Sequence, residues 1–202
     1  MAISAGAKIP AGTLKIAAPD GMKDVSTAEL FGGKKVVLFA VPGAFTPTCS
    51  AKHLPGFVGK AGDIKAKGVD SIICLSVNDA FVMDAWGQAH HAGDAVMMAA
   101  DGNAEFTRAL GLEFDASDFG MGVRAQRFAL IVDDGVVKGA YVEAPMKFEV
   151  SSAEAILEQL QAEKKRAALK IRAVSGGENP LHGCTAHDAR RDGRQSPARR
   201  PH

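Results

Sequence analysis

The sequence predicts an α/β domain in which parallel strands alternate with helices before an antiparallel hairpin extends the same sheet. Short continuous apolar runs, typical of strands buried on both faces, lie at 36–41, 69–77 and 96–99. Between them, apolar residues recur three and four positions apart, as on the inner face of a helix that packs on a sheet. Later in the chain, Asp133-Asp134-Gly135 separates two further apolar runs, which is the strongest short signal for a hairpin.

The run at 36–41 follows two lysines and ends at Pro42-Gly43, which predicts a central parallel strand. A loop over 43–50 leads into a helix that ends near Gly68. Its inner face is formed by Leu54, Phe57, Val58, Ala61 and Ile64. Because Pro55 lies inside this pattern, we expect a kink or a late start of the helix.

The next strand is expected at 69–77, with Asn78-Asp79 as the cap of the helix that follows it. That helix places its apolar face at Phe81, Val82, Ala85 and Trp86. A third short strand at 96–99 precedes a short helix over 103–110, closed by Gly111. The alternation indicates a parallel sheet up to this point.

The hairpin is expected to pair 127–132 with 136–142. Ser151 and Glu154 have the spacing of a capping box and predict the start of the last helix, whose apolar pattern weakens through 163–172. Its apolar face consists of Ala153, Ile156, Leu157 and Leu160. We therefore expect one domain over 1–170.

The segment 171–202 has a different composition, rich in Gly, Arg, Ser, Pro and His and without aromatic residues. Such a segment buries too little apolar surface to offset the entropy of ordering it. We expect a disordered basic tail outside the domain.

The composition excludes several classes of partner. With 24 basic and 23 acidic side chains among 202 residues, the chain has a net charge of +1 and no field that would attract nucleic acid or a membrane surface. It has neither a long apolar run nor a basic, apolar start, so we expect no spanning helix and no secretory signal. We therefore expect no nucleic-acid or membrane partner, and we expect a cytoplasmic location.

The three cysteines at 49, 74 and 184 are too few and too unevenly spaced for a disulfide framework, and none forms a C-x-x-C pair. This indicates a reducing compartment. Cys49 lies just past a buried strand at the expected start of a helix, where free N–H groups and the helix dipole favour a thiolate. From spacing alone, a reactive thiol and a small buried apolar residue are both possible for Cys49.

The segment 42–57, PGAFTPTCSAKHLPGF, resembles the P-x-x-x-T-x-x-C motif of peroxiredoxins in the form typical of the peroxiredoxin-5 (type II) group. Further similar segments lie at 76–87, 110–115 and 122–137, and the resemblance extends from residue 3 to about 165. It implies a thioredoxin-like fold with a central mixed sheet flanked by helices. It also implies a thiol peroxidase that reduces hydrogen peroxide and organic hydroperoxides without a bound cofactor or metal.

The resemblance assigns roles to four residues. Cys49 matches the cysteine that attacks the hydroperoxide and becomes a sulfenic acid. Thr46 matches the motif threonine, Pro42 the proline that walls the pocket, and Arg124 the active-site arginine, whose donors could hold thiolate and peroxide. Without the motif, these three would be interpreted as a turn threonine, a strand-ending proline and a surface arginine.

Other candidates are weaker. Arg127 precedes a strand, where an arginine is usually exposed or ion-paired. His53 lies four residues after Cys49, but no further ligands are nearby, so a structural hydrogen bond is expected rather than a metal site. Four aromatic residues are individually candidates for the core, although the resemblance suggests that some surround the active-site mouth and a homodimer contact: Phe45, Phe81, Trp86 and Phe119.

The remaining cysteines bear on how the sulfenic acid is reduced. Cys74 lies in the middle of an apolar strand, which predicts a buried and inert thiol. Animal members of the group carry a resolving cysteine after the second hairpin strand, whereas residues 143–150 contain none. This favours a one-cysteine cycle with an external thiol. Resemblance to bacterial and plant members implies glutathione, often with glutaredoxin, and thioredoxin is the alternative reductant.

Two further interpretations stay open. Cys184 could resolve Cys49 or, with His182 and His187, bind a metal weakly, although an incidental cysteine in the tail is the simpler interpretation. The whole protein could also be a stoichiometric redox sensor that passes the oxidised state of Cys49 to a partner. A pocket complete for catalysis favours the peroxidase.

Overall fold

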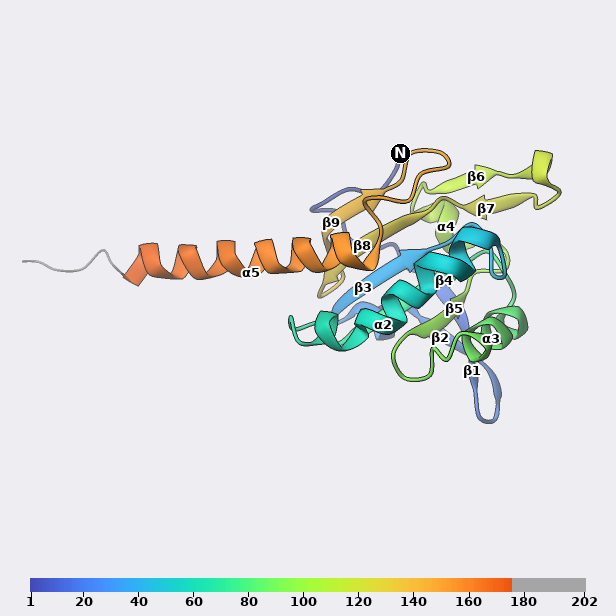
Figure 1. Ribbon diagram of the computed structural model, residues 1–202, viewed down its shortest axis with the longest axis horizontal. Helices are drawn as coiled ribbons and strands as arrows, with labels where there is room; N and C mark the ends of the chain where they lie inside the picture. The colour runs from blue at the N-terminus through green and yellow to red at the C-terminus, as the bar shows by residue number, and fades with distance from the viewer. Residues whose placement is uncertain (176–202) are drawn as a thin grey trace, which may run out of the picture.

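The computed structural model describes residues 1–175 and contains a seven-stranded mixed sheet with helices on both faces (Figure 1). The strand order is β2-β1-β5-β4-β3-β8-β9. The strands of this sheet are β1 Thr13–Ala18, β2 Gly21–Ser26, β3 Lys35–Ala40, β4 Ser71–Ser76, β5 Met97–Ala100, β8 Phe128–Asp133 and β9 Val136–Val142. A separate two-stranded ribbon pairs β6 Glu113–Asp115 with β7 Val123–Ala125.

The three central strands, β3, β4 and β5, are parallel, and the hairpin β8–β9 joins them antiparallel to β3. The predicted mixed sheet and each predicted strand are thus confirmed, with bounds that differ by one or two residues. At the hairpin, Asp134 and Gly135 both have positive φ, of 47° and 71°. Two such residues in succession match the twist of a tight hairpin, which is why the Asp-Gly signal was reliable.

Successive side chains of β3 point to opposite faces of the sheet and so build two cores. Val37 and Phe39 belong to the core beneath α2, α3 and α5, whereas Val36 and Leu38 belong to the core beneath α1 and α4. All four are fully buried. The helices are α1 Thr27–Phe31, α2 Leu54–Lys65, α3 Ala80–Ala89, α4 Glu105–Ala109 and α5 Ala153–Ser175.

The helix that follows β3 has two parts. A π-helical segment, η1 Cys49–His53, leads directly into α2, and Pro55 lies within the first turn of α2. Because the chain is already helical from Cys49, Pro55 lies inside a continuous helix. The irregularity expected at Pro55 is the π-helical segment just before it, rather than a late start. Asp79 caps α3 as predicted, since its carboxylate accepts from the N–H of Val82 at 2.9 Å.

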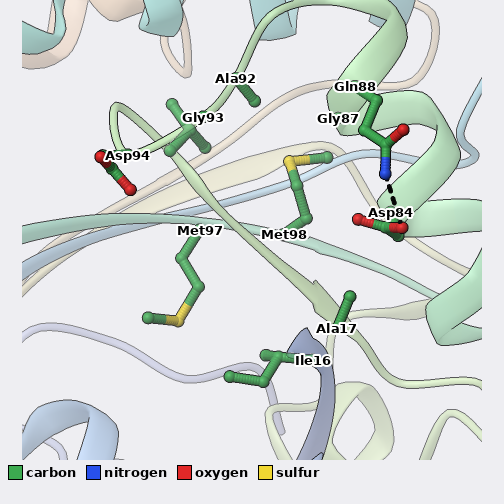
Figure 2. A pocket seen from close by; sticks show the side chains of 11 residues that line it. Ile16, Ala17, Asp84, Gly87, Gln88, Ala92, Gly93, Asp94, Met97 and Met98 are labelled. Atoms are coloured by element: carbon green, nitrogen blue, oxygen red, sulfur yellow. Dashed lines mark hydrogen bonds between the residues drawn. The ribbon is translucent and has the colours of Figure 1, made fainter. Parts of the chain in front are cut away.

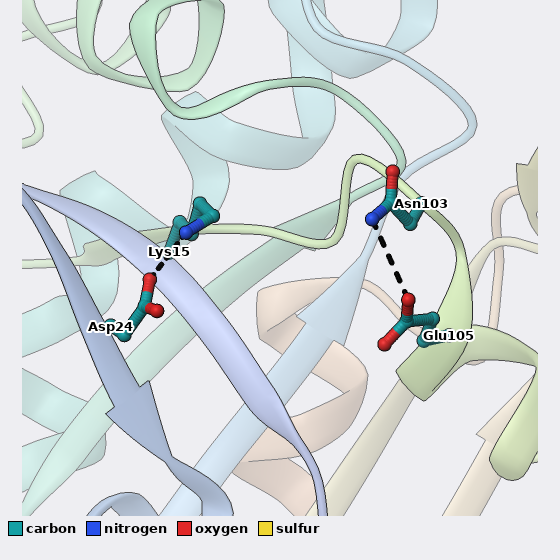
Figure 3. Close-up of polar contacts among 4 residues, drawn as sticks. All are labelled: Lys15, Asp24, Asn103 and Glu105. Atoms are coloured by element: carbon teal, nitrogen blue, oxygen red, sulfur yellow. Dashed lines mark hydrogen bonds and ion pairs between the residues drawn. The ribbon is translucent and has the colours of Figure 1, made fainter.

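The elements that the sequence did not predict are short or exposed. In the hairpin β1–β2 the ladder pairs Lys15 with Asp24, and the two exposed side chains form an ion pair (Figure 3). The same view shows Asn103 donating to Glu105 at the start of α4. Strand β2 is exposed along most of its length, so it carries little of the apolar pattern by which strands are recognised. The ribbon β6–β7 is only three residues long on each side.

The capping residue of α5 differs from the prediction. Ser152, not Ser151, precedes the helix, and its hydroxyl accepts from the N–H of Ala155 at 3.2 Å. Ser151 is fully buried and donates its hydroxyl to Glu143 instead. The predicted box at Ser151 and Glu154 is thus wrong by one residue, because a buried carboxylate competes for the first serine.

Helix α5 contacts α2 through its first two turns and then extends well beyond the sheet (Figure 1). The predicted apolar face is confirmed, with Ala153, Ile156 and Leu160 buried. The helix continues across residue 170 to Ser175. The expected disordered tail from there on, with Cys184 and its two neighbouring histidines, lies outside the described residues. Within 1–175 no helix is both long and apolar enough to cross a membrane.

Candidate active site

Cys49 begins the π-helical segment at the end of the loop that leaves β3, and it is fully buried. Thr48 before it already has helical backbone angles, and the N–H of Ser50 donates to the carbonyl of Thr46 at 3.0 Å. The cysteine therefore lies in the first turn of a continuous helix, the position that the sequence predicted. There the helix dipole favours negative charge on the sulfur.

The loop before Cys49 is held by short polar contacts. The hydroxyl of Thr46 donates to the carbonyl of Gly43 at 2.8 Å, and the N–H of Ala44 donates to the side chain of Asn78 at 3.0 Å. Phe45 has a φ of 59°, which is rare for a bulky side chain and costs about 1–3 kcal/mol. The structure thus keeps the loop in one strained shape beside the nucleophile.

The guanidinium group of Arg127 lies beside Cys49. Its Nη2 donates to Cys49 Sγ at 3.4 Å, and its Nη1 donates to His53 Nδ1 at 2.9 Å. None of the ion pairs within residues 1–175 includes Arg127. The expectation of an exposed or ion-paired side chain was therefore wrong. The cause is that residue 127 precedes β8, the strand paired with β3, so its side chain lies over the loop that leaves β3.

Arg124 has a different place. It lies in β7, where its Nε donates to the carbonyl of Met121 at 2.8 Å and its Nη1 to that of Val77 at 3.0 Å. A side chain built on Gly43 would come within 3.6 Å of the same Nη1, so Arg124 borders the active-site loop from outside. Both described hydrogen bonds of Arg124 go to backbone carbonyls, and the one guanidinium hydrogen bond to Cys49 comes from Arg127. The resemblance to peroxiredoxins had indicated Arg124 for this position.

His53 is fully buried at the end of the π-helical segment. Its Nε2 lies 3.0 Å from the carbonyl oxygen of Ser151, and its ring contacts Phe39, Phe57 and Phe148. Burial lowers the pKa of His53 to about 3, with the charge of Arg127 as the second cause. No group of three or more metal-ligating side chains exists in the part of the chain that the structure describes. The predicted hydrogen-bonding role is confirmed.

Glu143 is a functional candidate that the sequence did not indicate. Its Oε1 accepts from the N–H of Glu149 and from both the N–H and the hydroxyl of Ser151, at 2.7–2.8 Å. Burial raises the pKa of Glu143, but these hydrogen bonds outweigh it and leave the pKa below its ordinary value. An acidic residue that follows a half-buried strand end carries no sequence pattern that would mark it as buried.

Cys74 is fully buried in β4, and burial, with Cys49 as a second cause, raises the pKa of its thiol well above the ordinary value. A thiol that resists ionisation is a poor nucleophile. The predicted inert thiol agrees with this environment.

A pocket of about 540 Å³ opens beside the nucleophile and is walled by Pro42 and Arg127. Its other lining residues are Thr48, Phe114, Asp115, Phe119, Gln126, Glu143, Ala144, Pro145, Met146 and Lys147. Pro42 thus lies at the wall of this pocket. Among residues 1–175 no cysteine lines the pocket, although Cys49 lies next to Arg127.

The aromatic residues divide between core and surface. Trp86 is fully buried and its Nε1 donates to Ser50 at 3.0 Å. Phe45, Phe81 and Phe119 are 57%, 72% and 67% exposed, so the core assignment was wrong for these three. Phe119 lines the pocket, and Phe45 packs near Trp86.

A second pocket, of about 390 Å³, lies between α3 and the strands β1 and β5 (Figure 2). Its polar groups include Gln88 and Asp84, which hydrogen-bond to each other at 2.8 Å, and Met97 and Met98 supply much of its apolar wall. None of its lining residues is a cysteine, histidine, lysine or arginine. The pocket therefore offers no nucleophile, and the chemistry is concentrated at Cys49.

Comparisons with known proteins agree with this site. The Redoxin family model matches residues 4–157. Peroxiredoxin-2E-2, chloroplastic, of Oryza sativa subsp. japonica is 58% identical over 163 residues, which cover 78% of this chain and 72% of the relative. Peroxiredoxin-2B of Arabidopsis thaliana is 52% identical over 159 residues, which cover 78% of this chain and 98% of the relative.

Among solved structures, reduced Prx3 of Vibrio vulnificus in complex with H2O2 is 57% identical, with a TM-score of 0.76. The match covers 78% of this chain and 99% of that one. Peroxiredoxin 5 of Alvinella pompejana is 34% identical with a TM-score of 0.71, covering 79% and 99%. The fold is thus thioredoxin-like, and the chain belongs to the peroxiredoxin family of thiol peroxidases.

Proposed function

We propose that this peroxiredoxin reduces hydrogen peroxide and small organic hydroperoxides through Cys49 alone and is regenerated by glutathione, directly or through glutaredoxin. The observation that carries the proposal is the pairing of Cys49 with Arg127 at 3.4 Å, next to a pocket that no second cysteine of the described residues lines. The pairing supplies a nucleophile, and the pocket leaves room for an external reductant.

In the first step, the Cys49 thiolate attacks one oxygen of the hydroperoxide. An S–O bond forms and the O–O bond breaks, so the sulfur is oxidised to sulfenic acid. The leaving oxygen takes the electron pair and a proton and departs as water or an alcohol. Developing charge on that oxygen must be stabilised, and the guanidinium of Arg127 is a charged donor within reach.

The roles of the surrounding residues follow from their positions. We assign to Thr46 the hydroxyl that exchanges hydrogen bonds with the peroxide, because it stands three residues before Cys49 in the same turn. Pro42 walls the pocket and brings no competing N–H. Arg127 holds thiolate and peroxide. We assign to Arg124 a supporting part, since it ties the end of β4 to the ribbon beside the loop.

In the second step, glutathione thiolate attacks the sulfenic sulfur. The S–O bond breaks, the leaving hydroxide takes a proton from solvent and departs as water, and a mixed disulfide forms at Cys49. A second glutathione then displaces the protein thiolate and yields oxidised glutathione. Residues 143–150, where animal members of the group carry a resolving cysteine, contain no thiol, and Lys147 of this segment lines the pocket. Lys147 and Arg127 provide positive charge that suits the carboxylates of glutathione.

Mass spectrometry tests the cycle directly. After peroxide and glutathione are added, we expect one glutathione on the peptide that contains Cys49 and none on Cys74. An internal bridge between Cys49 and another cysteine of the chain would refute the one-cysteine cycle. Sustained peroxide consumption with thioredoxin, but not with glutathione, would assign the other reductant.

A stoichiometric redox sensor is the second candidate function, and the strained loop around Phe45 favours it, because strained segments can switch between two shapes. The count of turnovers separates the two. With excess glutathione, an enzyme consumes many equivalents of peroxide per chain, whereas a sensor consumes about one.

A further proposal concerns assembly. We propose a homodimer through the surface that carries Phe45, Phe81 and Phe119, because exposed aromatic side chains are enriched at such contacts. A cytoplasmic location stays a prediction. The names of two relatives include the word chloroplastic, which states the location of those two proteins and not of this one.

A further inference from the structure

We propose that His53 is a positioning residue, a neutral acceptor that aims the guanidinium of Arg127 at Cys49 without reducing its charge. The inference rests on the proposed function, because it concerns the same nucleophile. It adds a residue for which the sequence indicated only a structural hydrogen bond.

The hydrogen bonds fix the protonation of the ring. A guanidinium has donors only, so Arg127 Nη1, 2.9 Å from His53 Nδ1, requires a lone pair on that nitrogen. The single proton of a neutral imidazole is then on Nε2, which donates to the carbonyl of Ser151 at 3.0 Å. Both ring nitrogens are satisfied in only one tautomer and one ring orientation.

The ring has no freedom to turn away. It packs against Phe39, Phe57 and Phe148, with centroid separations of 4.9 Å, 5.6 Å and 4.9 Å. Arg127 lies over the ring of Phe148, 5.6 Å from its centroid. A fixed acceptor and a planar fork of donors together determine where Nη2 points, and it points at Cys49 Sγ.

The far side of the ring is anchored as well. Ser151, whose carbonyl accepts from His53, is held by Glu143 through its N–H and its hydroxyl, both at 2.8 Å. The N–H of Glu143 in turn donates to the carbonyl of Arg127 at 2.9 Å. These hydrogen bonds form a closed ring that runs from Arg127 through His53, Ser151 and Glu143 back to Arg127. The ring links the turn before α5 to the nucleophile.

A neutral acceptor has an electrostatic advantage over a carboxylate. A carboxylate paired with Arg127 would offset the positive charge that stabilises the thiolate and the leaving oxygen. The described ion pairs leave Arg127 without such a partner. The low pKa of His53, about 3, keeps the ring neutral at working pH, so it orients the guanidinium and transfers no proton itself.

The test compares His53→Phe, which keeps the ring and removes both hydrogen bonds, with His53→Asn, which keeps an acceptor near the position of Nδ1. Two rate constants are measured without any reductant. Oxidation of Cys49 by hydrogen peroxide is followed by the fluorescence of the single tryptophan, Trp86, which is bonded to Ser50. Alkylation of Cys49 by iodoacetamide is followed by the mass of its peptide, which separates it from the other two cysteines.

We expect His53→Phe to lower the rate of oxidation about 100-fold, the usual effect of misplacing a catalytic group by about 1 Å. Alkylation should fall much less, because iodoacetamide has no leaving oxygen for Arg127 to hold. His53→Asn should recover most of the rate of oxidation. Two controls should match the wild type: His91→Asn, at an exposed histidine, and Ile64→Val, which shortens a buried side chain at the opposite end of α2.

Several results would overturn the proposal. These are unchanged oxidation in His53→Phe, an equal fall of oxidation and alkylation, or no recovery in His53→Asn. If the phenylalanine variant does not fold, nitrogen-15 NMR of the wild type decides. It should show His53 as the Nε2–H tautomer with no titration between about pH 5 and 8, and a proton on Nδ1 would contradict the assignment. If wild-type Cys49 reacts slowly with peroxide, the proposed function fails, whereas the NMR signature still tests the placement of His53.

Discussion

At the scale of single residues, two arginines three positions apart have different surroundings. Arg127 donates to Cys49 Sγ, and Arg124 donates to two backbone carbonyls at the edge of the loop. Sequence spacing could not separate them, because both lie in one short segment that passes from β7 to β8. Which side chain reaches the nucleophile depends on the pairing of β8 with β3, and this pairing is a feature of the tertiary structure.

The two arginines can be separated by kinetics. Arg127→Ala should lower the rate of peroxide reduction about 100-fold or more, because it removes a charged donor from the reacting atoms. Arg124→Ala should lower it about 10-fold, through the loop that it supports. Steady-state peroxide consumption with excess glutathione measures both. A larger loss in Arg124→Ala than in Arg127→Ala would contradict the geometry.

His53 also makes stability depend on pH. Its pKa is about 3 in the folded protein and near its ordinary value of 6.5 in the unfolded chain, so the unfolded chain binds more protons between these values. The free energy of unfolding should therefore fall as the pH drops below about 6.5, by up to about 1.4 kcal/mol per unit. Urea denaturation at several pH values should show a shallower slope in His53→Asn.

The matched control is His91→Asn, which removes an exposed histidine and should keep the wild-type slope. Glu143, whose pKa is lowered, acts in the same direction but at lower pH, since its stabilising effect is lost as it becomes protonated. Equal slopes in the two histidine variants above about pH 5 would argue against a buried neutral His53.

At the scale of elements, the sequence predicted every strand that is buried on both faces and four of the five α-helices that pack on the sheet. It missed the hairpin β1–β2, the helix α1 and the ribbon β6–β7, which are short or largely exposed. The motif at 42–57 located Cys49, Thr46 and Pro42. It could not show the contacts of His53 with Ser151 or of Glu143 with the turn before α5, because these join positions about 98 and 8 residues apart whose meeting depends on packing.

The start of α5 offers a test at this scale. Ser152→Ala removes the cap and should lower the free energy of unfolding by about 1 kcal/mol. Ser151→Ala removes a hydrogen bond to a buried carboxylate and should cost about 1.5–3 kcal/mol. Glu154→Ala, at the exposed position of the box that the sequence suggested, should change the free energy of unfolding by less than about 0.5 kcal/mol.

Urea denaturation monitored by circular dichroism measures all three variants. The order of the losses distinguishes the structure from the sequence pattern. A capping box at Ser151 and Glu154 would make Glu154→Ala costly and Ser152→Ala harmless.

At the scale of the whole molecule, exposed aromatic side chains near the active-site loop bear on assembly. Phe81 is 72% exposed on α3, so Phe81→Asp should leave the stability of the fold within about 0.5 kcal/mol of the wild type. If this surface forms the homodimer, the variant should elute as a monomer in size-exclusion chromatography. Leu169→Asp, at a 66% exposed residue on the outer part of α5, is the matched control and should not change the elution.

The central claim is that Cys49 is the one residue that peroxide oxidises and an external thiol restores. Mass spectrometry after one equivalent of hydrogen peroxide, with and without glutathione, tests it most directly. The account predicts one added oxygen on Cys49 alone, replaced by one glutathione when glutathione is present, and neither product in Cys49→Ser. Oxidation of another cysteine in place of Cys49, or peroxide reduction that persists in Cys49→Ser, would contradict it.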